Sequence, residues 1–153
     1  MRHSLIVGIV VLVAFAREGA LASANEPAEL VVVVNSANTI KLTSSMLENV
    51  FLRKTTNWDD GIRVIPINGV PDSERRHTFD RAALGMSPDE VARYWLDLRI
   101  RGGGTAPREV DDPIVTLKLV GRLQGAIGYV PAGTVIDGVT IVARVRGTKV
   151  ILP

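Results

Sequence analysis

The chain has 153 residues, with 18 lysines and arginines against 16 aspartates and glutamates, and it contains no cysteine. A net charge of +2 is too small to predict binding to nucleic acid or to an anionic membrane surface. Because disulfides and thiolate metal centres are excluded, the domain has to be held together by its hydrophobic core.

The first 24 residues have the three parts of a secretory signal peptide. Arg2 and His3 give a basic start, residues 5–16 are apolar, and Ala22-Ser23-Ala24 is a small-x-small cleavage site. The apolar run is shorter than the roughly 20 residues that span a bilayer. We predict cleavage after Ala24 and a single periplasmic domain over residues 25–153, with no further membrane attachment. Retention of the leader as an uncleaved anchor is the alternative.

The first elements of this domain are a strand, a helix and a second strand. Leu30 and the four valines after it form an apolar run without alternation, which predicts a strand buried on both faces, as in a parallel sheet. Thr43 can cap a helix whose apolar side chains, from Met46 to Phe51, recur on one face. Residues 63–67 predict another short strand.

Helices and strands continue to alternate after this point. One helix is expected to begin at Ser73 and to end at Gly85, and Ser87-Pro88-Asp89-Glu90 is a capping box that starts the next. We then expect a glycine-rich loop, a helix and two strands, at residues 102–107, 112–123, 126–130 and 139–145. This order predicts an α/β fold, a three-layer sandwich around a mainly parallel, doubly wound sheet.

Two of these segments resemble a known family. Residues 42–58, LTSSMLENVFLRKTTNW, resemble the helix and turn of phosphate-type periplasmic substrate-binding proteins, which commonly contain Ile-Phe-Leu-Gly-Lys-x-x-x-Trp. Four residues match that pattern, with Arg53 in place of the glycine: Phe51, Leu52, Lys54 and Trp58. Residues 124–130, QGAIGYV, are similar to the Pro-Gly-Ala-Ile-Gly-Tyr-Val strand of the same family. The resemblance implies one lobe of the type II periplasmic-binding-protein fold, whereas full-length members have two lobes that close around a ligand.

The resemblance also implies an anion site. In phosphate-binding members a Ser-Gly-Thr triplet at the start of a helix grips the oxyanion, and Ser73-Glu74-Arg75 lies in its place here. The glutamate puts a negative charge where phosphate would dock, which Arg75 and Arg76 could offset. Ser36, in the first strand-to-helix loop, is a further candidate ligand. The alternative is that Ser73 only caps its helix and Ser36 only belongs to a turn.

The sequence contains few patterns that are typical of catalytic or metal-binding sites. Outside the leader His77 is the single histidine, so a zinc site lacks ligands, and Ser73, His77 and Asp80 on one helix do not make a hydrolase triad. We therefore expect no enzyme activity and no cofactor. The leading hypothesis is an exported solute-binding protein for phosphate or a related oxyanion, with an ABC permease as its partner. The alternative is a periplasmic interaction or structural protein that keeps the fold without the ligand.

Overall fold

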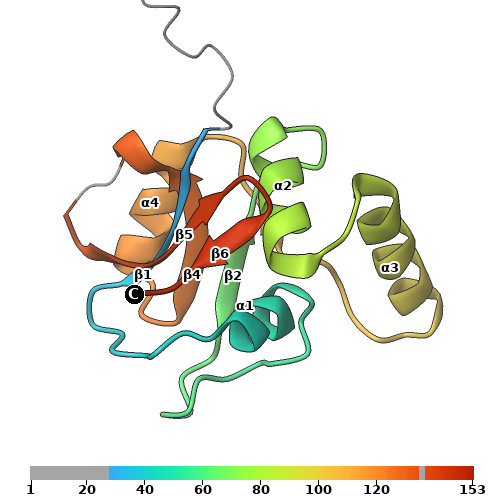
Figure 1. Cartoon of the computed structure of the whole chain (residues 1–153). Coiled ribbons are helices and arrows are strands. Elements are labelled where there is room, and N and C mark those ends of the chain that lie inside the picture. The colour runs from blue at the N-terminus through green and yellow to red at the C-terminus, as the bar shows by residue number, and fades with distance from the viewer. Residues whose placement is uncertain (1–27, 135–136) are drawn as a thin grey trace, which may run out of the picture.

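The computed structural model describes residues 28–134 and 137–153, so the predicted signal peptide lies outside the described residues. Six strands form one sheet, shown in Figure 1, in the spatial order β3 (Arg108–Glu109), β2 (Ile65–Asn68), β4 (Ala126–Pro131), β1 (Leu30–Asn35), β5 (Val139–Arg146) and β6 (Lys149–Ile151). The helices are α1 (Ser44–Phe51), α2 (Glu74–Phe79), α3 (Pro88–Ile100) and α4 (Pro113–Arg122). A π-helical turn (Asp80–Leu84) extends α2, and a short 3₁₀ turn (Ala132–Thr134) follows β4.

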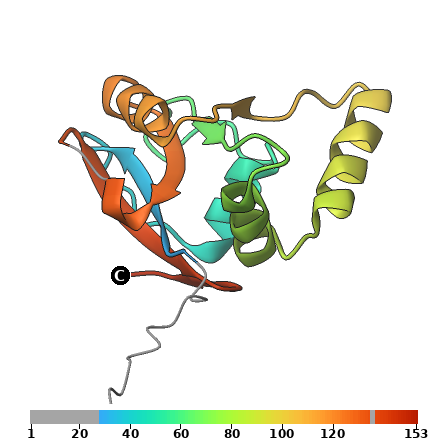
Figure 2. The same cartoon turned by 90° about the horizontal axis from the view of Figure 1, so that it is seen from above.

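The helices cover both faces of the sheet, which confirms the predicted α/β sandwich. On one face the side chains of Val32 and Val34 share a core with α1 and α2, and on the other Val31 and Val33 pack with α4. Figure 2 shows α4 on the opposite side of the sheet from α1 and α2. All four valines are completely buried.

The pairing of the strands corrects the expectation of a mainly parallel sheet. β2 is parallel to β3 and β4, but β1 is antiparallel to both β4 and β5, and β5 is antiparallel to β6. The sheet is therefore mixed. A continuous valine run indicates burial on two faces, and helices on both sides provide that burial whichever way the strand runs.

The segment after α1 accounts for Trp58. Its side chain is buried, and its indole N–H donates a hydrogen bond to the carbonyl oxygen of Gly125 at 3.1 Å. The tryptophan belongs to the same buried cluster as Val50 and Phe51 at the end of α1, and Gly61 closes the next turn with a φ of 83°.

The conformation at the end of α1 explains why the resembling family has glycine where this chain has Arg53. The amide of Arg53 bonds to the carbonyl of Val50 and that of Lys54 to the carbonyl of Asn49, which is the Schellman pattern. In this pattern the residue after the C-cap is left-handed, and Arg53 has a φ of 61°. Arg53 is the non-glycine residue with positive φ in the described part of the chain, at the position where the resembling family has glycine.

We predict that Arg53→Gly stabilises the protein. A left-handed conformation costs a residue with a side chain about 1–2 kcal/mol, part of which is offset by the greater freedom of glycine in the unfolded chain. The free energy of unfolding, measured by chemical denaturation, is expected to rise by about 0.5–1 kcal/mol. Lys54→Gly is the control, since Lys54 is not left-handed, and it should lower stability. A loss of stability in Arg53→Gly would contradict the assignment.

Candidate functional site

The start of α2 lies directly after β2, at the carboxyl end of that strand. Ser73 is the N-cap, and its hydroxyl oxygen accepts a hydrogen bond from the amide of Arg76 at 3.2 Å. The same hydroxyl donates to the carbonyl oxygen of Val70 at 2.8 Å. Its single proton is therefore engaged, and it can contact a ligand as a donor only by leaving Val70.

A group of polar atoms converges on Gly69, just before this helix. A methyl group built on Gly69 would lie 3.1 Å from the Tyr129 hydroxyl, 3.2 Å from Ser73 Oγ and 3.4 Å from Arg75 Nε. The amide of Gly69 donates to the Tyr129 hydroxyl at 2.9 Å, and that hydroxyl donates to the side-chain oxygen of Asn68. Burial raises the pKa of Tyr129 well above its ordinary value, so the hydroxyl stays neutral.

Arg75 joins α2 to the segment that follows β3. Its Nη2 donates to the carbonyl oxygens of Val110 at 2.9 Å and Asp111 at 2.8 Å. Its Nε is buried and has no hydrogen-bond partner among the described residues. One charged donor of this guanidinium is thus left over, next to Ser73 and Tyr129.

Arg76 is buried and forms an internal ion pair. Its Nε donates to Oδ2 of Asp80 at 2.6 Å and its Nη1 to the carbonyl oxygen of Gly69 at 2.8 Å, while Glu109 Oε1 lies 4.0 Å away. Burial raises the pKa of the Asp80 carboxyl, against the opposing effect of Arg76. The charge of Arg76 is matched from inside the protein, so it does not offset Glu74 as the sequence suggested.

The structure brings together three of the four predicted site residues: Ser73, Arg75 and Arg76. It does not bring Ser36 to them. Ser36 follows the carboxyl end of β1, and because β1 is antiparallel to β4, this is the end of the sheet where β2 and β4 begin. Ser36 is exposed there and its amide bonds to the carbonyl of Gly138 at 3.1 Å. The expectation that it lies beside the other candidates is wrong, because it assumed a parallel β1.

Sequence reasoning missed the roles of Gly69 and Tyr129. In the sequence Tyr129 stands out only as part of the QGAIGYV segment, and nothing local connects it to a glycine sixty residues earlier. The His77 ring bonds to the carbonyl of Pro71 at 2.7 Å and not to Ser73, so no nucleophile and base are paired on this helix.

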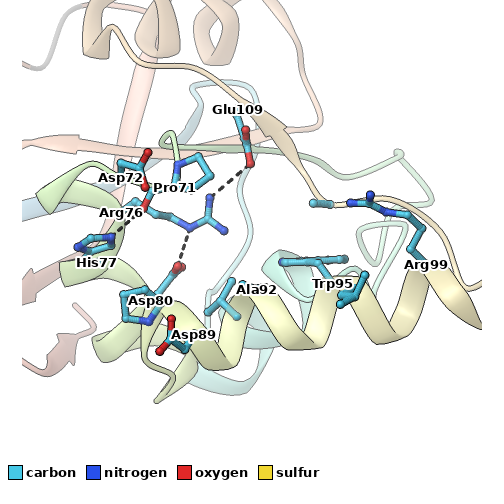
Figure 3. A pocket seen from close by; sticks show the side chains of 14 residues that line it. Pro71, Asp72, Arg76, His77, Asp80, Asp89, Ala92, Trp95, Arg99 and Glu109 are labelled. Carbon is cyan, nitrogen blue, oxygen red and sulfur yellow. Dashed lines mark hydrogen bonds and ion pairs between the residues drawn. The ribbon is translucent and has the colours of Figure 1, made fainter.

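A groove of about 500 Å³ lies between α2 and α3, and Arg76 is among the residues that line it. Figure 3 shows Arg76, Asp80 and Glu109 at one end of it and Trp95 along the α3 wall. Across the described ranges, no group of three or more metal-binding side chains is arranged around a common point. Within residues 28–134 and 137–153, no helix has the length and apolar character needed to cross a membrane.

No protein-family model and no curated protein matches the chain. Among solved structures it is similar to an ABC-type phosphate transport receptor from Vibrio cholerae, with 20% identity and a TM-score of 0.59 over 76% of this chain and 47% of that one. It is also similar to a putative phosphate ABC transporter substrate-binding protein with bound phosphate from Clostridium perfringens (20% identity, TM-score 0.60, 76% and 46% of the two chains). A third is PstS from Borrelia burgdorferi (16%, 0.54, 71% and 43%).

These similarities show the fold. The chain spans less than half the length of each of the three proteins. The resemblance seen in the helix-and-turn segment is therefore confirmed at the level of the fold, and the partial coverage agrees with one lobe.

We predict that Asp80→Ala is strongly destabilising. It leaves the buried Arg76 guanidinium without its carboxylate, which costs about 3–5 kcal/mol when one partner of a buried pair is removed. The free energy of unfolding should fall by that amount in urea titrations.

The matched control for this variant is Asp97→Ala. Asp97 and Arg101 form a pair with the same spacing at 3.0 Å, but both side chains are more than half exposed. The expected loss is less than about 0.5 kcal/mol. Equal losses in the two variants would contradict the importance of burial at Asp80.

Proposed function

We propose that the chain is an exported solute-binding domain, residues 25–153 after removal of a signal peptide, that takes phosphate or a related small oxyanion at the start of α2. The observation that carries the proposal is the buried Nε of Arg75, which has no partner in the described part of the chain. An oxyanion accepts hydrogen bonds, and a guanidinium N–H is a strong, charge-assisted donor.

The surroundings of Arg75 support the same ligand class. The hydroxyls of Ser73 and Tyr129 lie around Gly69 together with this nitrogen, and a Cβ at Gly69 would come within 3.1–3.4 Å of all three atoms. The first amides of a helix have no intrahelical acceptor and favour an anion. Glu74, whose charge opposes an anion, has an exposed side chain and is free to point into solvent.

The similar solved structures supply the biological context of the proposal. Two of them are an ABC-type phosphate transport receptor and a putative phosphate ABC transporter substrate-binding protein. We accordingly propose a periplasmic location, binding without catalysis, and an ABC permease as the partner that receives the ligand.

A second function, a periplasmic interaction or structural protein, is favoured by a different observation. Ser73 is fully engaged as a cap and Arg76 is neutralised by Asp80, so two of the three residues at α2 already have structural partners. In that case Arg75 serves only to tie α2 to Val110 and Asp111.

Calorimetric titration of the domain with phosphate, and then sulfate, at low salt tests the choice. We expect saturable binding that weakens about tenfold or more in Arg75→Met, because a hydrogen bond to a charged group contributes about 1.5–3 kcal/mol.

Arg101→Met is the control for lost positive charge, since Arg101 is the C-cap of α3 and pairs with Asp97. It should bind phosphate within about twofold of the parent, in keeping with the screening of distant surface charges. No heat at millimolar phosphate would reject the oxyanion site and favour the interaction protein. An equal loss of phosphate affinity in Arg75→Met and Arg101→Met would show that binding depends only on the overall positive charge.

A further inference from the structure

We propose that the groove between α2 and α3 is a second binding site, for an organic cation: a guanidinium or ammonium group on a short apolar stem. The groove is distinct from the oxyanion spot, since neither Ser73 nor Arg75 is among the residues that line it. The inference therefore stands apart from the proposed function.

The charge of the groove is opposite to that of the chain. Four carboxylates and two guanidiniums line it: Asp72, Asp80, Asp89, Glu109, Arg76 and Arg99. With His77 neutral this leaves two net negative charges, on a protein whose net charge is +2. Low-dielectric walls concentrate such a local field, so the groove attracts cations and repels the phosphate class of ligand.

Asp80 provides an unused acceptor in the wall of this groove. Its Oδ2 takes the hydrogen bond from Arg76, but its Oδ1 is buried and has no partner among the described residues. Asp80 as a whole is only 2% exposed. A buried carboxylate oxygen without a donor is costly, and a cationic N–H entering from the groove would remove that cost. This atom is the observation that points to a ligand, beyond the acidic character of the groove.

Trp95 supplies the apolar part of the site. Its indole lies along the α3 wall of the groove, where Figure 3 shows it between Ala92 and Arg99, and Tyr94 packs edge-on against it at 5.0 Å. An indole face attracts a guanidinium or ammonium group within about 6 Å. Val91 and Ala92 on the same helix provide surface for a methylene stem. Carboxylates at one end and an indole along the wall match a cation that carries such a stem.

The test uses N-acetyl-arginine amide as the cation and N-acetyl-citrulline amide as its neutral isostere. Calorimetry at low salt should show saturable binding of the arginine compound and none of the citrulline compound. Glu109→Gln, at the acidic end, should weaken binding about threefold to tenfold, and Trp95→Leu by a similar factor. Asp97→Asn removes an equal charge from α3 outside the groove and should leave the affinity unchanged.

Asp80→Asn would remove the carboxylate charge, but the fold depends on the same side chain through the bond of Oδ2 to Arg76, so Glu109→Gln carries the test. Failure of the arginine compound to bind at ten millimolar, equal binding of the citrulline compound, or equal effects of Glu109→Gln and Asp97→Asn would overturn the proposal. Phosphate titrated in the presence of the arginine compound should bind as before, so the two sites succeed or fail separately. A leucine-flanked arginine peptide then separates the sources: tighter binding than the amide indicates a protein side chain, and equal binding indicates a free small amine.

Discussion

The valine strand β1 is the element on which the rest of this protein depends. It pairs along both edges, with β4 and with β5, and it is buried on both faces, so nearly all of its backbone and side-chain surface is removed from water. Helices α1 and α2 pack on one face and α4 on the other because β1 presents apolar side chains to both. The start of α2, with both proposed sites beside it, is placed by this layer of helices against the sheet.

The buried Arg76–Asp80 pair lies beside both proposed sites. Asp80 matches the charge of Arg76, whereas the Nε of the neighbouring Arg75 has no partner in the described part of the chain. Only Oδ2 of Asp80 bonds to Arg76, and its Oδ1 has no partner among the described residues. An unpartnered donor suited to an anion and an unpartnered acceptor suited to a cation thus lie close to one buried ion pair. Such a pair contributes little to stability compared with apolar residues of similar volume.

Local features of the fold could be predicted from the sequence, and long-range ones could not. The caps at Thr43, Ser73 and Ser87 were predicted because a cap depends on residues three positions apart. The direction of β1 was not, since burial on both faces is compatible with either direction, and the misplacement of Ser36 followed from that single error. The short strands β3 and β6 were also missed, because a segment of three residues or fewer shows no periodicity.

At the site, Arg75 was a candidate from its position in the motif. Its hydrogen bond to Val110 and the neutralisation of Arg76 by Asp80 could not be predicted, because they depend on which rotamers the packed structure allows.

The pairing of β1 also sets the order in which this chain can fold. Val31 lies opposite Val130 on one side and Arg144 on the other, so the strand made first has to wait for partners made last. Contacts of such long sequence separation slow folding. Until they form, an apolar β-branched segment with two open edges is exposed, which is the type of segment that aggregates. The long-range pairing that buries β1 in the folded domain therefore leaves this strand exposed during synthesis, until β4 and β5 are available to pair with it.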